Sequence, residues 1–306
     1  MSVVVGLSNY TRDRGVCALA IGVFDGVHWG HREIFRTLNE RARELGARSV
    51  ALTFDRHPAE LFAPASAPEY INTIEQRIEQ IREAGVDEVV IAEFDLELAN
   101  LSKEDFLRKV VGNTFGAKHV VVGSNFRFGR NREGDTRYLA QFLPEVQVGL
   151  SVVPAVIISG GPVSSTRIRA LVNRGDIAEA SKLLGKRFTL RGLVVAGEQI
   201  GRSLGFPTAN LQTEPRQLVP ADGVYAVEAA IGKSVFSGVC NIGQRPTFGG
   251  GLRTIEVHFM GFEGNLYGTK LDVVFIRRLR DEMVFERPEH LAAQIREDLK
   301  RVRGHH

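Results

Sequence analysis

Two histidines stand at the end of a glycine-rich turn, Gly22 to His31, near the start of the chain. The turn follows an apolar run and precedes residues 32–45, in which apolar side chains recur at helical spacing. This order predicts a strand, a turn and a helix whose first backbone N–H groups can bind an anion, phosphate above all. Because His28 and His31 are three residues apart, we expect both imidazoles on one face, where they can donate to nucleotide phosphates.

The same turn holds further residues that suit a phosphate ligand. Glycine lets the backbone approach a ligand closely, and an aspartate lies between the glycines. The alternative interpretation is an ordinary strand-to-helix turn with two solvated histidines. We favour a nucleotide site, which we predict to include Gly22, Phe24, Asp25 and Gly30.

A second anion-binding motif is the run of hydroxyls that opens a predicted helix near residue 165. Hydroxyls and a guanidinium at a helix start suit an anion, whereas helix capping alone accounts for only one of the three hydroxyl residues. We therefore predict nucleotide contacts from Ser164, Ser165, Thr166 and Arg169.

Two segments that leave predicted strands carry aromatic side chains. Phe54 and Pro58 can contact a flat ring, although a plain strand exit is the alternative. Asn125, Phe126 and Phe128 follow another strand, and packing in the core is the usual fate of such aromatic residues. Both segments are expected at the mouth of the crevice that holds the histidine turn.

The second half of the chain carries its own candidate site. Gly197, Gly201 and Gly205 stand four residues apart and predict a loop that can fold over phosphates, with a plain connection between strands as the alternative. Thr208 and Asn210 follow on an extended segment, so their side chains point the same way. Their oxygens suit Mg²⁺. No G-K-[ST] follows the glycines, which excludes a P-loop kinase.

The strand predicted at 254–260 alternates apolar and polar residues. Its polar face carries Glu256 and His258, and solvent exposure is the alternative for any such face. If that face lies near Thr208, the Glu256 carboxylate can accept a hydroxyl proton during phosphoryl transfer. Asn241 and Arg245, in the preceding segment, can serve a ligand or the fold itself.

Strand and helix signals alternate from residue 1 to about 186. Helical crossovers between strands imply a parallel, doubly wound sheet, whose ligands bind beyond the carboxyl ends of the strands. Ser102 is expected to cap one of the helices, which runs to residue 111. The predicted strands are 18–24, 49–54, 88–91, 119–122 and 148–158.

The pattern changes after Lys186 to short β-rich runs separated by glycine- and proline-containing turns. These runs predict a compact antiparallel barrel, followed by an amphipathic helix at 289–302. We therefore predict an α/β fold of two domains, 1–186 and 187–306. The strands of the second domain are predicted at 188–195, 223–229, 234–242, 254–260 and 270–277.

The composition is that of an ordinary globular protein. The 306 residues suffice for two domains with cores of their own, and the net charge of +3 does not favour a general nucleic-acid binder. Two cysteines without a C-x-x-C pair argue against a disulfide framework or structural zinc. We expect a soluble cytoplasmic protein with small-molecule substrates, no nucleic-acid or membrane partner and at most weak homo-oligomerisation.

Taken together, these motifs resemble the bifunctional riboflavin kinase/FMN adenylyltransferases, the prokaryotic FAD synthetases. The resemblance runs from about residue 18 to 299 and includes the nucleotidyltransferase signature H-x-G-H at 28–31 and the P-T-A-N run at 207–210. It implies a Rossmann-like nucleotidyltransferase domain that converts FMN to FAD with ATP. It also implies a riboflavin kinase β-barrel that phosphorylates riboflavin with Mg²⁺-ATP.

The resemblance further implies roles for individual residues. His28 and His31 would steady the ATP phosphates and the leaving pyrophosphate, and Asn125 would join the nucleotide site, where many relatives carry aspartate. In the barrel, Thr208 and Asn210 would hold Mg²⁺ and phosphates, and Glu256 would be the base for the ribityl hydroxyl. Flavin contacts are expected from Phe54, Pro58, Phe126, Phe128, Asn241 and Arg245.

Two other functions stay open at this point. One is a single-activity nucleotidyltransferase that acts on a different phosphorylated substrate. In that case the barrel domain would have no function in catalysis. The other is a flavin sensor without turnover, which would not need to retain all the residues that suit chemistry: His28, His31, Thr208, Asn210 and Glu256.

Overall fold

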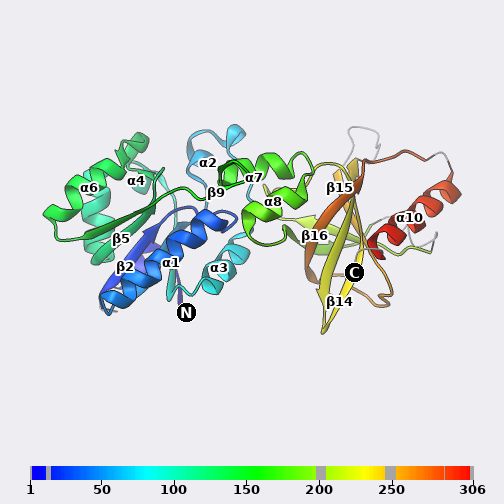
Figure 1. Ribbon diagram of the computed structural model, residues 1–306, viewed down its shortest axis with the longest axis horizontal. Helices are drawn as coiled ribbons and strands as arrows, with labels where there is room; N and C mark the ends of the chain where they lie inside the picture. The colour runs from blue at the N-terminus through cyan, green and yellow to red at the C-terminus, as the bar shows by residue number, and fades with distance from the viewer. Residues whose placement is uncertain (1, 12–14, 198–204, 245–252, 286, 304–306) are drawn as a thin grey trace. The chain divides into compact units, whose positions relative to one another are not determined.

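The computed structural model describes residues 2–11, 15–197, 205–244, 253–285 and 287–303. By its internal contacts the chain forms two compact units. The first comprises Met1–Glu69 and Ile74–Ser165, and the second comprises Tyr70–Thr73 and Thr166–His306. Both are drawn in Figure 1.

A six-stranded parallel sheet forms the centre of the first unit (Figure 1). Its strand order is β1-β4-β3-β2-β5-β8, so the chain runs outward from β2 through β3 to β4 and then returns to β5 on the other side of β2. The switch in direction lies at β2, where such sheets bind their ligands. The strands are β1 (Ser2–Val5), β2 (Cys17–Ile21), β3 (Arg48–Phe54), β4 (Glu88–Ala92), β5 (Ala117–Gly123) and β8 (Gly149–Val153).

Helices bury both faces of this sheet, because alternate residues of each strand point to opposite sides. Ala18 and Ala20 of β2 pack in one apolar cluster with Phe35 and Leu38 of α1. Leu19 belongs to the other cluster, which includes residues 106–111 and 139–143. The helices are α1 (Trp29–Glu44), α2 (Pro58–Phe62), α3 (Ile74–Glu83), α4 (Leu96–Ala99), α5 (Lys103–Asp105) and α6 (Thr136–Glu145).

The helix predicted after Ser102 has a different form from the one expected. Ser102 caps α5 as predicted, since its Oγ accepts a hydrogen bond from the Asp105 N–H at 3.0 Å. The chain then continues as a π-helix over Phe106–Thr114. Periodicity alone does not separate this wider helix from an α-helix. Shorter elements complete the unit: 3₁₀ turns at Leu7–Asn9, Pro64–Ser66 and Arg130–Arg132, and the strands β6 (Arg127–Phe128), β7 (Gly134–Asp135), β9 (Ile157–Ile158) and β10 (Gly161–Pro162).

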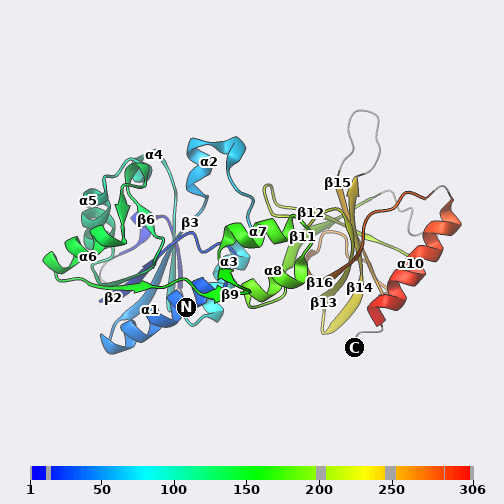
Figure 2. The same ribbon diagram turned by 45° about the horizontal axis from the view of Figure 1, so that its top comes forward.

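The second unit is a closed antiparallel barrel with helices attached (Figure 2). Its strand order is β11-β12-β15-β14-β13-β16. The helices are α7 (Ser165–Val172), α8 (Ile177–Leu184) and α10 (Pro288–Arg303). The strands are β11 (Thr189–Val195), β12 (Ala209–Thr213), β13 (Gly223–Ile231), β14 (Ser234–Gln244), β15 (Arg253–Phe259) and β16 (Lys270–Arg280).

One short segment from the first half of the sequence belongs to this barrel unit. The Tyr70 N–H donates to the Arg216 carbonyl at 2.8 Å, and the Leu218 N–H donates to the Tyr70 carbonyl at 2.8 Å. The segment Tyr70–Thr73 is therefore a short strand-like strap of the second unit.

The predicted α/β fold is confirmed, with a parallel sheet, an antiparallel barrel and a terminal helix. The strand predicted at 148–158 is wrong as one element, because the structure divides it into β8 and β9. The edge strand β1 has no counterpart among the predictions. The compact units divide at Ser165, so α7 and α8 pack with the barrel, and the domain boundary at 186 stays a prediction.

Candidate active sites

The turn between β2 and α1 forms the first candidate site. His28 is the N-cap of α1, and its backbone carbonyl accepts the first bond of the helix, from the Arg32 N–H at 3.0 Å. The N–H groups that precede Arg32 have no acceptor within an α-helix. The turn therefore presents backbone donors and the positive end of a helix dipole beside two imidazoles.

The two histidine rings lie against each other. His28 and His31 stack with ring centroids 3.7 Å apart and an angle of 18° between their planes, and Phe24 meets His31 edge to face at 5.4 Å. A Cβ on Gly30 would lie only 3.1 Å from the Cε1 atom of His28. A larger residue at 30 would therefore press on the stack, which explains the small residue in the H-x-G-H motif.

The surroundings of His31 keep its imidazole uncharged. Burial, the neighbouring His28 ring and the Arg77 guanidinium hold the pKa of His31 well below its usual value of 6.5. Its Nδ1 atom is buried and makes no hydrogen bond to the residues that the structure describes. A neutral ring with an unused polar atom, at a helix N-terminus, suits an incoming phosphate.

The backbone of this turn adopts conformations that side chains seldom take. Phe24 and Val27 have φ angles of 52° and 39°, and both are buried. Such strain persists only where the surroundings enforce it. A Cβ on Gly22 would lie 2.8 Å from the Phe24 ring, and the Ser165 hydroxyl holds the Asp25 carbonyl at 3.0 Å.

The other residues predicted for this site lie at several places. Asn125 is exposed after β5, and Phe126 stacks on the buried Phe128 at 5.6 Å, so Phe128 packs in the core. Phe54 is buried at the end of β3, and Pro58 begins α2. Ser164 precedes α7. Thr166 and Arg169 lie on α7 and belong to the second unit.

In the barrel, the candidate residues form a row across three neighbouring strands. Asn210 of β12 lies directly opposite Glu256 of β15, and Glu256 lies opposite Asn241 of β14. Directly opposed residues of antiparallel strands share one face of a sheet. The predicted base therefore stands between two amides. Burial, and then the Glu256 carboxylate, raise the pKa of the Cys240 thiol beside the row, which keeps that thiol protonated.

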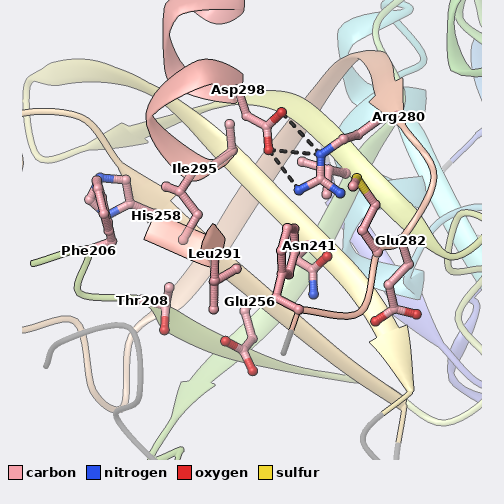
Figure 3. A pocket seen from close by; sticks show the side chains of 14 residues that line it. Phe206, Thr208, Asn241, Glu256, His258, Arg280, Glu282, Leu291, Ile295 and Asp298 are labelled. Carbon is pink, nitrogen blue, oxygen red and sulfur yellow. Dashed lines mark hydrogen bonds and ion pairs between the residues drawn. The ribbon is translucent and has the colours of Figure 1, made fainter. Parts of the chain in front are cut away.

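A cavity of about 300 Å³ lies over this row and reaches α10 (Figure 3). Thr208, Asn241 and Glu256 line it together, whereas Asn210 does not. The Asn210 amide instead lies against the backbone of Gly197, where an added Cβ would meet it at 2.2 Å. Apolar side chains cover the opposite wall, among them Met283, Phe285, Leu291 and Ile295.

An ion pair fastens α10 over the cavity. Arg280 of β16 donates to both carboxylate oxygens of Asp298, with Nη2 at 2.8 Å and Nε at 3.0 and 3.1 Å, as Figure 3 shows. The Gln294 amide adds a bond to the same carboxylate at 3.0 Å. The Asp298 side chain is 2 % exposed and that of Arg280 14 %. The pair therefore fixes the apolar wall relative to the barrel.

Comparison with known proteins identifies both halves. Residues 11–167 match the FAD synthetase family and residues 184–305 match the riboflavin kinase family. A bifunctional riboflavin kinase/FMN adenylyltransferase of Pseudomonas fluorescens is 39% identical over 99% of this chain and 97% of its own length. The enzyme of the same name from Escherichia coli K12 is 36% identical over 97% and 96%. The chain belongs to the bifunctional riboflavin kinase/FMN adenylyltransferase family.

The likeness extends to the fold of the whole chain. A crystal structure described as a macrolide-efflux protein of Streptococcus pneumoniae superposes with a TM-score of 0.90 at 30% identity and covers 98% of both chains. That description differs from the names of the curated family members. Among the residues described here, no helix is long and apolar enough to cross a membrane.

Some of the predicted site residues lie outside the part of this family member that the structure describes. Gly201 and Arg245 lie outside the residues that the structure describes, as does most of the loop that Gly197 and Gly205 flank. Asn265 accepts a hydrogen bond from the Tyr267 N–H at 2.9 Å and so stabilises its own turn.

Three residues near the sites were not predicted from the sequence. Arg77 is 1% exposed and donates to the Phe54 carbonyl at 2.9 Å. Arg77 stands on the face of α3 that carries Ile74, Ile78 and Ile81. A charged residue on an apolar helix face indicates a buried charge that is hydrogen-bonded, so this position could have been recognised from the sequence. The Arg280–Asp298 pair had no such signal, since its partners lie on separate elements.

Proposed function

We propose that the barrel unit phosphorylates riboflavin to FMN and that the parallel-sheet unit adenylylates FMN to FAD, with ATP as the donor in both reactions. The pairing of Glu256 with Asn241, both of which line a largely apolar cavity, is the observation that carries the kinase assignment. The stacked pair of His28 and His31 at the start of α1 carries the adenylyltransferase assignment.

In the kinase reaction, the ribityl hydroxyl oxygen forms a bond to the γ-phosphorus of ATP and the bond to the ADP oxygen breaks. Glu256 accepts the hydroxyl proton, because a carboxylate is a suitable base at neutral pH. Asn241, which lines the cavity beside Glu256, orients the groups that react. The apolar wall against α10 suits the flavin ring, which is a flat and largely apolar ligand.

Magnesium fits the donors that the barrel offers. Thr208 and Asn210 supply neutral oxygens, and Mg²⁺ binds few protein oxygens beside those of the nucleotide phosphates. The described residues contain no cluster of three or more His, Cys, Asp or Glu side chains that would hold a metal without a nucleotide. When bound, the ion offsets the negative charge of the phosphates.

In the adenylyltransferase reaction, a phosphate oxygen of FMN attacks the α-phosphorus of ATP and pyrophosphate leaves. No protein nucleophile is required, so the residues act by position and charge. His28, His31 and the first N–H groups of α1 bind phosphate oxygens and stabilise the charge that develops on pyrophosphate. Ser165, whose hydroxyl donates to the Asp25 carbonyl at 3.0 Å, steadies the turn that carries these histidines.

Chromatography of the products from riboflavin, ATP and Mg²⁺ tests both activities in one incubation. We expect FMN to appear first and FAD to follow. Absence of both products, together with adenylylation of another phosphorylated substrate supplied in a second incubation, would favour a single-activity nucleotidyltransferase. Binding of riboflavin without either product would favour a flavin sensor.

The variant Glu256→Gln separates the two sites. It keeps the size of the side chain and removes the base, so we expect FMN formation to fall by about 10²–10⁴-fold. FAD formation from supplied FMN should be unchanged, since His28 and His31 belong to the other unit. Equal loss of both activities in a folded variant would contradict the assignment.

A further inference from the structure

His258 lines the barrel cavity and has no part in the mechanism above. It stands two residues after Glu256 on β15, so both side chains lie on the same face of the strand. Its Nδ1 atom lies 2.9 Å from the Pro207 carbonyl oxygen, and its ring meets Phe206 edge to face at 5.5 Å. Because a carbonyl only accepts hydrogen bonds, Nδ1 carries the proton and donates.

This hydrogen bond begins where the backbone pairing ends. β12 and β15 pair at Asn210 with Glu256 and at Ala209 with Val257. One step further, Thr208 stands opposite His258, outside the ladder. Pro207 has no N–H with which to extend the ladder. The imidazole of His258 therefore takes the place of a strand hydrogen bond and holds the segment 206–208 against β15.

The bond to Pro207 acts directly on Thr208. The Pro207 carbonyl belongs to the same planar peptide unit as the Thr208 N–H. A hydrogen bond that holds the Pro207 carbonyl therefore also holds the orientation of this peptide plane, which includes the Thr208 Cα that carries the side chain. The Arg296 guanidinium of α10 lies 5.8 Å from the centre of the Phe206 ring and supports the segment from its other end. Figure 3 shows His258 beside Phe206 and Thr208 beside Glu256.

We propose that His258 is a positioning residue for phosphoryl transfer, which holds the Thr208 hydroxyl where it can serve Mg²⁺-ATP. The inference rests on the proposed role of Thr208 in the kinase site. His258 contacts neither phosphate nor flavin in this scheme, because it acts only through the peptide that links Pro207 to Thr208.

Two substitutions at the same position separate the hydrogen bond from the bulk of the side chain. His258→Asn places an amide N–H near the position of Nδ1, whereas His258→Phe keeps a ring that can still pack on Phe206 and removes the donor. We expect His258→Phe to raise KM for Mg²⁺-ATP or lower kcat of the kinase by about tenfold in total, the effect of one lost hydrogen bond. KM for riboflavin should stay unchanged, and His258→Asn should restore most of the activity.

Circular dichroism and the melting temperature, compared with wild type, report whether the barrel of each variant is folded, and FAD formation from supplied FMN reports that the other unit is intact. Equal kinase activity of the Phe and Asn variants would overturn the proposal, as would a loss that falls on KM for riboflavin. If the Phe variant does not fold, the Asn variant decides. Kinase activity near that of wild type with an unchanged KM for Mg²⁺-ATP supports the donor role, and a folded Asn variant without kinase activity overturns it.

A double-mutant cycle with Thr208→Ala gives the strictest test. If His258 acts only through Thr208, then His258→Phe has no further effect on the kinase once the Thr208 hydroxyl is gone. Multiplication of the two losses would mean that His258 acts on the reaction by another route and would overturn the proposal. A wild-type chain without kinase activity would instead refute the proposed function itself.

Discussion

The imidazoles of His28 and His31 share one stack, with their ring centroids 3.7 Å apart. A proton on either ring opposes a proton on the other, and Arg77 adds to the same repulsion at His31. The His31 imidazole is thus held neutral in the free site. An anion placed between the rings and the helix start changes that balance in favour of the protonated form.

Nucleotide binding should therefore be coupled to proton uptake. The pKa of His31 is well below 6.5 in the free protein, and the negative phosphates of ATP raise it. Near pH 6 we expect the bound protein to take up a fraction of a proton. Calorimetric titration with ATP in two buffers of different ionisation enthalpy measures this uptake. His31→Asn should reduce it, and identical heats in both buffers would exclude the coupling.

The same pKa gives the stability of the first unit a pH dependence. The unfolded chain binds a proton at His31 near pH 6.5, whereas the folded chain does so only at lower pH. Below pH 6.5 the unfolded state therefore holds more protons, and stability falls as the pH falls towards the folded pKa. The melting temperature measured from pH 7.5 to 5.5 should decrease more steeply for wild type than for His31→Asn. Parallel curves would show that His31 does not contribute.

The substitution Gly22→Ala should damage the adenylyltransferase site alone. The new Cβ would lie 2.8 Å from the Phe24 ring, which packs on His31. Overpacking of this kind costs about 1–3 kcal/mol, and the displaced ring moves His31. We expect FAD formation to fall by about tenfold or more, a shift of the size that a misplaced catalytic group produces.

A control for this prediction exists in the same unit. A Cβ on Gly112 would make only ordinary contact, 3.5 Å from the Leu107 carbonyl. Gly112→Ala should therefore leave FAD formation unchanged. Chromatography of FAD from supplied FMN compares the two variants, and similar rates for both would contradict the steric argument.

Removal of the charge of Asp298 should loosen α10 from the barrel. The substitution Asp298→Asn leaves the Arg280 guanidinium buried without its anion, and breaking such a pair costs about 3–5 kcal/mol. We expect a lower urea midpoint for the barrel and a raised KM for riboflavin, because α10 carries part of the cavity wall. The neighbouring variant Glu297→Gln is the control, since that carboxylate is half exposed and its loss should change neither value.

Much of the fold and of both sites follows from local sequence patterns. The β2–α1 turn was predictable because glycines, histidines and helical spacing coincide within one short stretch, and Glu256 because its strand alternates regularly. Whether Asn210, Glu256 and Asn241 lie side by side depends on which residues of neighbouring strands pair. The alternation of apolar and polar residues within a strand does not determine this register. Register also hides the role of His258, since Pro207 lies 51 residues away in the sequence.

Other features could not be predicted for equally physical reasons. The π-helix at Phe106–Thr114 has an apolar face like that of an α-helix, so its wider turn leaves little trace in the pattern. The stack of His28 on His31 needs the backbone strain at Phe24 and Val27, which no propensity favours. From the sequence, Phe128 could contact a flavin ring or pack in the core, and in the structure it is buried.

The strap Tyr70–Thr73 has a consequence for how such a chain can be divided. It lies in the sequence of the first unit and is hydrogen-bonded within the second. No single cut therefore yields both units whole. A gene fragment that ends near residue 186 carries the strap away from Arg216 and Leu218, and one that begins there leaves those residues without it. The second unit therefore cannot be moved whole into a new protein unless the segment Tyr70–Thr73 is supplied with it.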